Sequence, residues 1–374
     1  MRLLHVTNSL APSGAERHLA NLLGPLDALG VENHLVTFFP GNGFEATVRR
    51  HVRRAELAVG RLRALPVAAR MAREADAVHT QLAYGDILGR CAAAVARRPS
   101  FTTIQTSAWA ASNRAALAMD PLRYNAFRLA DRLTAPLGAH FFAVSTRAAR
   151  AYIDDLGVPE ARVEVLANSV DLEAFDPSRG PSREEARRAL GVSPGAFLAV
   201  TLARLIPLKG LPDAIRAVSI VARERPVELL IAGDGSQRDE LLGLVAALGA
   251  PVSLPGRQDP LLVLKAADLF VLSSYLEGMP VSLLEAMAMG LPCLCTDIPE
   301  SVETGGDAVA YAPPRDPEAL ARALRALVDD PPRRAALGLR GRERSQRYAA
   351  TAIARRYLAG IERVLAARGP GRAP

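Results

Sequence analysis

Ala266–Glu303 has the sequence AADLFVLSSYLEGMPVSLLEAMAMGLPCLCTDIPESVE, which predicts a strand, a loop and a helix in succession and so an α/β architecture. Leu269–Leu272 is a short apolar run followed by two serines, a pattern typical of a buried strand in a parallel sheet. Pro280 suits the first turn of the following helix, because its fixed φ is helical and the first amides of a helix are unpaired. We expect that helix to end at Met289, with Gly290 as a left-handed C-terminal cap.

Two glutamates, Glu277 and Glu285, lie on either side of the start of this predicted helix. They are eight positions apart, so that one lies in the loop and the other about a turn and a half inside the helix. Such loops open at the carboxyl edge of a parallel sheet, where ligands bind and where a helix N-terminus attracts anions. Two carboxylates beside this helix end suit a ligand with both hydroxyls and phosphate, such as a nucleotide sugar. Taken alone, the spacing also fits two solvated carboxylates.

The surrounding residues favour the ligand-binding interpretation, because the stretch resembles the E-x7-E signature of the retaining glycosyltransferases of family 4. The matching positions are Glu277-Gly278, Glu285-Ala286-Met287, Gly290, Pro292 and Glu303. The resemblance implies the GT-B architecture, in which two Rossmann-like domains with parallel sheets face each other across a cleft. The acceptor would bind to the N-terminal domain and the nucleotide sugar to the C-terminal domain.

The resemblance also implies roles for individual residues of this stretch. Glu277 would meet the sugar hydroxyls, and Glu285 would meet the ribose of the nucleotide. The donor would in addition face a short run of backbone at Gly278, Met279 and Pro280.

Two cations are expected at the phosphate end of the same site. Arg204 lies just past the predicted strand Phe197–Ala203, and Lys209-Gly210 follows five positions later. These residues resemble the G-R-L and K-G elements that hold the donor diphosphate in the family, with Ala203 in place of the glycine. The resemblance implies that Arg204 and Lys209 stabilise the charge that develops on the leaving diphosphate. Lys209 and Lys265 are the only lysines of the chain, which makes surface charge a weaker explanation of Lys209.

Gly233-Asp234-Gly235 follows another predicted strand, Val227–Ile231. Its simpler interpretation is turn chemistry alone. The resemblance instead places Gly233 and the loop Pro255-Gly256-Arg257 around the nucleotide base. Because the sequence has no Asp-x-Asp metal motif, we expect a metal-independent transferase without cofactors, whose UDP- or GDP-linked donor is a substrate.

The N-terminal half begins with a predicted strand, Arg2–Thr7, and a predicted helix, Ala15–Leu29, with a buried stripe of leucines at positions 19, 22, 23 and 26. Between them, Ser13-Gly14-Ala15-Glu16 resembles the glycine-rich loop of the family, which lies near the acceptor and the donor diphosphate. Ser13 stands where a second glycine is common. Gly14 is therefore a candidate donor-binding residue and Glu16 an acceptor-side candidate, unless the glycine serves only the turn.

Two further acceptor-side candidates are His79 and Gln105. The family often has a Thr-x-His pattern after a strand, but here Thr103-Ile104-Gln105 places an amide there, and an amide cannot take up a proton as imidazole does. Gln105 can still hydrogen-bond the acceptor or the sugar. His79, at the end of the predicted strand Ala77–Thr80, is a candidate substitute, or else a histidine that is merely hydrogen-bonded.

Strands alternate with helices along the whole chain, which predicts right-handed βαβ crossovers and parallel sheets. We place the domain junction in Asp171–Ser182, which contains two prolines and a glycine. The expected domains are an acceptor-binding domain of residues 1–172, joined by the C-terminal helix 350–368, and a nucleotide-sugar-binding domain of residues 183–349. The arginine-rich segment of the N-terminal half is predicted to be helical with a break near Pro66.

The chain has 374 residues, enough for two domains, because a single core rarely exceeds about 250–300 residues. No apolar run approaches the roughly 18 residues that cross a membrane, and Leu3–Val6 is too short for a signal peptide, so we expect a cytoplasmic protein. The three cysteines, Cys91, Cys293 and Cys295, give neither a disulfide framework nor zinc-ligand spacing and are expected to be buried free thiols.

The net charge of +7 is almost wholly due to arginine. One cluster in the N-terminal half consists of Arg49, Arg50, Arg53, Arg54, Arg61, Arg63, Arg70 and Arg73. Such a patch attracts anionic lipid, nucleic acid or acidic polymers. Aromatic residues make up only 5% of the chain and none alternates with these arginines, so no nucleic-acid partner is expected. Contact with an anionic membrane and a solvated basic face are the two interpretations of this patch.

These observations predict a retaining hexosyltransferase that moves a sugar from a nucleotide sugar to a lipid-linked or glycan acceptor, in bacterial cell-surface polysaccharide or glycolipid synthesis, in the cytoplasm or peripherally on the inner face of the cell membrane. Front-face attack, in which the leaving oxygen accepts the acceptor proton, needs no protein base and is compatible with Gln105. A nucleotide-sugar-binding subunit without catalysis and a sugar-nucleotide epimerase of similar fold are the alternatives. Donor binding without transfer or hydrolysis indicates the first, and conversion of the donor without an acceptor indicates the second.

Overall fold

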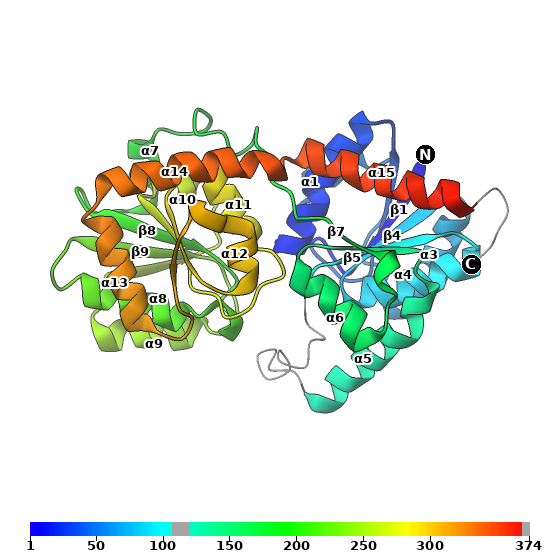
Figure 1. Ribbon diagram of the computed structural model, residues 1–374, viewed down its shortest axis with the longest axis horizontal. Coiled ribbons are helices and arrows are strands. Elements are labelled where there is room, and N and C mark those ends of the chain that lie inside the picture. The colour runs from blue at the N-terminus through cyan, green and yellow to red at the C-terminus, as the bar shows by residue number, and fades with distance from the viewer. Residues whose placement is uncertain (107–119, 369–374) are drawn as a thin grey trace. The chain divides into compact units, whose positions relative to one another are not determined.

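The computed structural model describes residues 1–106 and 120–368, which form two compact units (Figure 1). The first unit consists of Met1–Ser169 together with the C-terminal helix α15 (Ala350–Arg368). The second unit is Val170–Ala349. No helix in the described ranges is long and apolar enough to cross a membrane.

The first unit is built on a sheet of seven parallel strands in the order β3-β2-β1-β4-β5-β6-β7. The strands are β1 (Arg2–Thr7), β2 (Glu32–Thr37), β3 (Arg54–Glu56), β4 (Ala77–Gln81), β5 (Ser100–Ile104), β6 (His140–Ala143) and β7 (Val163–Val165). The helices of this unit that precede α15 are α1 (Gly14–Ala28), α2 (Glu45–His51), α3 (Arg61–Arg73), α4 (Ala83–Ala96), α5 (Pro121–Thr134) and α6 (Thr146–Leu156).

Helices cover both faces of this sheet. α1 packs with α2 and with α15, whereas α3 packs with α4, and α4 packs with α5. Neighbouring residues of β1 enter different cores, because a strand points successive side chains to opposite faces: Leu3 shares a cluster with Tyr357 of α15, and Leu4 shares one with Met71 of α3. The predicted leucine stripe of α1 is confirmed, since the leucines at positions 19, 22, 23 and 26 are all buried.

The arginine-rich segment differs from the prediction. It contains the short edge strand β3 between α2 and α3, and α3 continues through Pro66 without a break. Pro66 lies in the middle of α3, where it removes a single backbone hydrogen bond, a cost that the buried apolar face of this helix offsets. β3 has the sequence RAE and owes its strand conformation to pairing with β2, which no apolar pattern could have indicated.

The second unit has a sheet of six parallel strands in the order β10-β9-β8-β11-β12-β13. The strands are β8 (Phe197–Leu202), β9 (Val227–Ala232), β10 (Val252–Gly256), β11 (Leu269–Leu272), β12 (Cys293–Thr296) and β13 (Ala310–Ala312). The helices are α7 (Arg183–Leu190), α8 (Leu211–Val221), α9 (Arg238–Leu248), α10 (Pro260–Ala266), α11 (Val281–Ala288), α12 (Pro299–Gly305), α13 (Pro317–Val328) and α14 (Pro331–Ser345).

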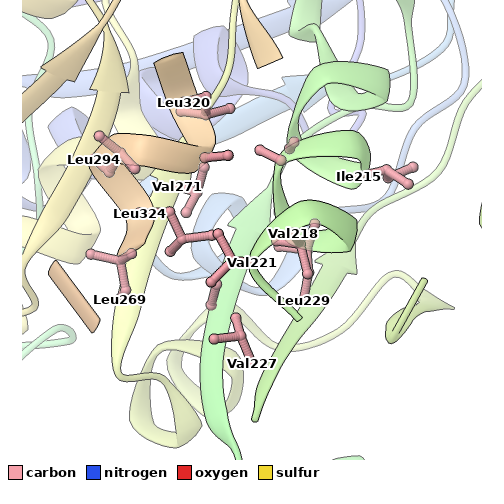
Figure 2. Close-up of a cluster of buried hydrophobic side chains, with 14 of the residues drawn as sticks. Ile215, Val218, Val221, Val227, Leu229, Leu269, Val271, Leu294, Leu320 and Leu324 are labelled. Atoms are coloured by element: carbon pink, nitrogen blue, oxygen red, sulfur yellow. The ribbon is translucent and has the colours of Figure 1, made fainter. Parts of the chain in front are cut away.

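The main core of the second unit lies between this sheet and the helices α8 and α13. Val218 and Val221 of α8 gather with Leu324 of α13 and with Leu229 and Val271 of the sheet (Figure 2). Of the cysteines, Cys293 and Cys295 on β12 are buried free thiols as predicted, whereas Cys91 on α4 is only partly buried. Packing of this kind holds the strand ends of the sheet in fixed positions.

Candidate active site

Two loops at the carboxyl edge of the second sheet form the candidate site. β8 and β11 are neighbours in the sheet, so the loop after β8 (residues 203–210) and the loop after β11 (residues 273–280) leave the sheet side by side. The chain continues from β8 to β9 on one side and reaches β11 on the other. Ligands of open parallel sheets bind at such a change of direction, beyond the carboxyl ends of the strands.

Hydrogen bonds join these two loops directly. The Tyr275 N–H donates to the Leu208 carbonyl over 2.8 Å, and the Ser273 hydroxyl donates to the Lys209 carbonyl over 2.9 Å. Gly210 makes this approach feasible, because its φ is +58° and a Cβ there would lie 2.1 Å from the Ser273 carbonyl oxygen. The backbone therefore fixes the position from which the Lys209 side chain extends.

Lys209 and Glu277 meet across the two loops. Lys209 Nζ donates to Glu277 Oε1 over 2.6 Å, and Ser274 Oγ donates to the same oxygen, also over 2.6 Å. The side chains of Lys209 and Glu277 are only 17% and 8% exposed, so water screens the pair weakly. Both donors converge on Oε1, which holds the carboxylate in one orientation and leaves Oε2 without a donor among the described residues.

Tyr275 braces the same loop from a second side. Its hydroxyl donates to Asp213 Oδ2 of α8 over 2.6 Å, and the Arg315 guanidinium carbon lies 4.1 Å from the centre of its ring. Burial, followed by the hydrogen bond to Asp213, raises the pKa of Tyr275 above its ordinary value and keeps the hydroxyl protonated as a donor. Sequence reasoning did not single out Ser274 or Tyr275, although their position directly after β11 and beside Glu277 was the available signal.

The two arginines predicted for this site, unlike Lys209, do not contact Glu277. Arg204 follows β8 and is exposed, and its guanidinium makes no hydrogen bond or ion pair within the described ranges. Arg257 follows β10 and is exposed in the same way. The structure thus brings Lys209 to Glu277 and leaves both guanidinium groups outside that contact.

At Gly233 the backbone of the loop after β9 closely approaches the backbone at Ala203. A Cβ at Gly233 would lie 1.8 Å from the Ala203 carbonyl oxygen, and one at Gly235 would lie 2.4 Å from that of Leu205. The Leu205 N–H also donates to the Asp234 carbonyl over 2.9 Å. The loop after β9 is therefore packed against the Arg204 loop, which is more than the turn chemistry that the sequence alone indicates.

α11 starts one residue later than predicted, so Pro280 is its N-cap residue and not its first helical residue. The residue remains compatible with the helix start, because its extended ψ of 100° turns the chain into the first turn. Met279 and Pro280 are buried, Gly278 is partly buried, and Glu285 in the second turn is 4% exposed. Gly290 has a φ of +71° directly after the C-cap, which confirms the predicted left-handed end.

In the first unit, the loop after β1 holds a buried carboxylate at the start of α1. Gly14 is the first residue of α1, and Glu16 is 4% exposed. Ser13 Oγ donates to Glu16 Oε2, and Ser9 Oγ donates to Oε1 over 3.4 Å. Ser13, which stands where the family commonly has glycine, thus positions Glu16 and does not cap the helix with its side chain.

His79 lies inside the core, two residues before the end of β4, and not at the strand end as predicted. Its Nδ1 is 2.9 Å from His5 Nδ1, and its Nε2 is 2.9 Å from Thr103 Oγ1. Burial lowers the pKa of His79 well below its ordinary value. With no exposed surface and both ring nitrogens engaged, His79 fits the alternative interpretation of a hydrogen-bonded core histidine.

Gln105 directly follows β5, and its Nε2 is buried without a hydrogen-bond acceptor among the described residues. The neighbouring strand β4 ends with Gln81, whose Nε2 donates to Thr7 Oγ1 over 3.2 Å and to the Ala15 carbonyl over 3.4 Å. Its Oε1 is likewise buried without a donor in the described ranges. Sequence reasoning missed Gln81, because the predicted strand ended one residue early at Thr80.

Comparison with family models matches both halves of the chain. The model described as Glycosyltransferase Family 4 matches residues 12–174, and the model described as Glycosyl transferases group 1 matches residues 182–344. One match falls on each of the two compact units, apart from residues 170–174, which the first match shares with the second unit.

Individual relatives share part of their length with this chain. One is the GDP-mannose-dependent monoacylated alpha-(1-6)-phosphatidylinositol monomannoside mannosyltransferase of Corynebacterium glutamicum, 32% identical over 48% of this chain and 50% of that protein. Another is the UDP-Gal:alpha-D-GlcNAc-diphosphoundecaprenol alpha-1,3-galactosyltransferase of Escherichia coli, 28% identical over 60% of this chain and 58% of that protein. The chain thus spans about half the length of these curated relatives.

Solved structures match nearly the whole chain at low identity. HepE of Anabaena in complex with UDP-glucose has a TM-score of 0.82 at 20% identity, covering 97% of this chain and 100% of HepE. Sucrose-phosphate synthase of Thermosynechococcus elongatus has a TM-score of 0.76 at 18% identity, covering 98% of this chain and 100% of the synthase. These likenesses establish the fold and confirm the predicted pair of Rossmann-like domains with parallel sheets.

Proposed function

We propose that this chain, which belongs to the GT-B glycosyltransferases of the family 4 type, transfers a sugar from a nucleotide-sugar donor to a lipid-linked or glycan acceptor with retention at the anomeric carbon. The observation that carries this proposal is the contact of Lys209 with Glu277 at the carboxyl edge of the second sheet. One cation and one carboxylate are held there by backbone-fixed loops, at the position where an open parallel sheet binds its ligand.

The atoms of Lys209 and Glu277 left unpaired within the described ranges match the chemical groups of a nucleotide-sugar donor. Lys209 uses one N–H on Glu277, and its other two have no acceptor among the described residues, so they are available to a diphosphate. Glu277 Oε2 is available to accept from sugar hydroxyls. We assign Arg204, exposed on the same loop as Lys209, to the diphosphate as well, and Glu285, Gly233 and Arg257 to the nucleoside.

The proposed reaction breaks the bond between the anomeric carbon and the diphosphate oxygen. The acceptor oxygen attacks from the same face, and its proton passes to the departing diphosphate oxygen. Lys209 and Arg204 stabilise the negative charge on that oxygen, an effect that is strong in a site with little water. No side chain takes up the acceptor proton on this route, which agrees with an amide at Gln105. Since the sequence lacks an Asp-x-Asp motif, we assign charge neutralisation to these cations and propose a metal-independent reaction.

We further propose a peripheral location at a membrane, in bacterial glycolipid or polysaccharide synthesis. The names of both relatives specify lipid-linked acceptors, a phosphatidylinositol mannoside and a diphosphoundecaprenol sugar. The predicted basic patch supports this location only partly, because three of its arginines are paired with carboxylates: Arg49 with Glu45, Arg54 with Glu74, and Arg70 with Glu56.

Thermal unfolding in the presence of nucleotide sugars tests the donor assignment. We expect UDP-glucose or GDP-mannose to raise the unfolding temperature, and Glu277→Gln to remove most of that rise, because the sugar hydroxyls lose their carboxylate. Product analysis by NMR with the stabilising donor then gives the anomeric configuration. Stabilisation by no nucleotide sugar contradicts the proposal, and stabilisation without transfer or hydrolysis indicates a binding subunit.

A further inference from the structure

Helix α5 presents an outward apolar face that no part of the described chain covers. Leu122, Leu129 and Leu133 are 80%, 57% and 69% exposed. They are seven and four positions apart, which places their Cα atoms within about 20° of a common line along the helix. Ala126, exposed between them, extends the same stripe. Single exposed leucines are ordinary on protein surfaces, but three in one line are not.

The opposite side of α5 is tied to the unit by a buried polar triad. Asp131 lies nine positions from Leu122, on the reverse of the helix, and is 1% exposed. It accepts from Tyr152 Oη of α6 over 2.9 Å and from the fully buried Arg90 of α4. Arg90 also donates to Thr134 Oγ1 at the end of α5 over 3.0 Å. Rotation of α5 would break these bonds, so the leucines are held outward.

The charges beside the leucine stripe are positive. Arg123 and Arg132 are exposed and lie about 100° to one side and about 80° to the other of Leu122. Arg132 forms no ion pair within the described ranges, and Arg123 lies over the Phe127 ring of its own helix. The only carboxylate within Pro121–Thr134 is that of the buried Asp131. An apolar stripe between arginines is typical of helices that lie in the interface of an anionic bilayer.

We propose that the outward face of α5 docks on an anionic lipid bilayer, with the three leucines inserted below the headgroups and the two arginines on the lipid phosphates. This inference rests on the proposed function, since a lipid-linked acceptor lies in such a bilayer. Charge decides between a bilayer and a second copy of the chain. A two-fold contact between two such faces would bring arginine against arginine, whereas anionic headgroups complement both arginines.

Co-sedimentation with vesicles tests the docking face. The full chain is mixed with vesicles of phosphatidylglycerol and phosphatidylcholine, and with vesicles of phosphatidylcholine alone. We expect Leu129→Asn together with Leu133→Asn to weaken binding to the anionic vesicles by about tenfold or more, because burial of each leucine is lost. Leu339→Asn is the matched control, because Leu339 is 63% exposed on α14 in the second unit, and it should bind like the unchanged protein. Arg123→Gln with Arg132→Gln should weaken binding and reduce its dependence on salt.

Three results would overturn the docking face. These are no binding of the unchanged protein to anionic vesicles, equal binding by the leucine double variant, and a concentration-dependent dimer that the leucine double variant abolishes. Failure of the proposed function is distinguished by nucleotide-sugar stabilisation measured without vesicles, which the leucine variants should leave unchanged. Vesicle binding that depends on the leucines, in a protein that no nucleotide sugar stabilises, would keep the docking face and remove the transferase assignment.

Discussion

Replacement of Lys209 by methionine removes the ammonium group that donates to Glu277 while keeping an unbranched side chain. Loss of one partner of a fully buried ion pair costs about 3–5 kcal/mol, because the other charge stays buried. The side chains of Lys209 and Glu277 are 17% and 8% exposed, and Ser274 still donates to the carboxylate after the change. We therefore expect a smaller loss of unfolding free energy, about 2 kcal/mol.

A double-mutant cycle with Glu277→Gln separates this pair from its surroundings. The second single variant should also lose about 2 kcal/mol, whereas the double variant leaves no uncompensated charge and should lose about 1–2 kcal/mol less than the sum of the two. In a unit of this size, 2 kcal/mol corresponds to about 4–8 °C in the unfolding temperature. Calorimetry of the ligand-free protein measures all four species, with the transition of the second unit assigned by its response to nucleotide sugar.

Sugar transfer should follow a different pattern from stability. Each single variant and the double variant should lose about a hundredfold or more in kcat, the effect of removing one charge-stabilising donor from a transition state. If the double variant recovers stability relative to the sum of the single variants but does not recover sugar transfer, the pair acts on the donor. Additive losses of stability, with a coupling below about 0.3 kcal/mol, would refute the ion pair seen in the structure, and unchanged transfer would refute the site.

The remaining predictions concern the loop contact and the histidines. Gly210→Ala should lower the unfolding free energy by several kcal/mol, because backbone strain at a positive φ, about 1 kcal/mol, adds to the clash of a Cβ 2.1 Å from the Ser273 carbonyl oxygen. Gly249→Ala is the control, because Gly249 has a φ of +56° in open space and should show the strain alone. Urea unfolding measures both losses, and equal losses would contradict the loop contact. Burial lowers the pKa of His18 from 6.5 to about 3 and that of His5 from 6.5 to about 4, so the unfolded chain binds more protons than the folded chain below pH 6.5. Each histidine should therefore remove about 2 kcal/mol of unfolding free energy between pH 7.5 and pH 5. Urea unfolding at both pH values measures this loss, and His18→Gln should reduce it.

The fold was most predictable where a segment is short, fully buried and bounded by residues that end structure. β11 has the bounds predicted from sequence, because it is a run of four buried residues followed by two serines. β3 was not predictable, since its side chains alternate between charge and alanine and its conformation comes from pairing with β2. Pro66 shows the same limit, because local rules expect a break that the packing of α3 prevents.

For the site, the family resemblance indicated that Lys209 and Glu277 belong to one site, whereas sequence spacing could not name the residues that hold them in place. Glu277 and Lys209 could be named from their own segments, and the structure places their side chains 2.6 Å apart although 68 positions separate them. Ser274 and Tyr275 could not be named, since their roles depend on the carboxylate orientation and on the backbone of the neighbouring loop. His79 was placed at a strand end because the predicted strand stopped at Thr80, whereas β4 continues to Gln81 and His79 lies buried two residues before that end.

In each unit two loops meet at the carboxyl edge of the sheet, but different chemical groups join them. In the second unit the loops at the carboxyl edge are joined by an ion pair, Lys209 with Glu277, whose charges an anionic and hydroxylated ligand can take over. In the first unit, the loops after β1 and β4 are joined by neutral groups, with Gln81 donating to Thr7 and the Asn8 side chain accepting from the Gly85 amide. Exchange of a cation from a protein carboxylate to a phosphate costs little electrostatic energy, because one charge-assisted hydrogen bond replaces another. The groups that join the loops of the first unit, and the buried Glu16 carboxylate beside them, can hydrogen-bond an alcohol, so we expect the diphosphate-linked donor on the second unit and the hydroxyl-bearing acceptor on the first.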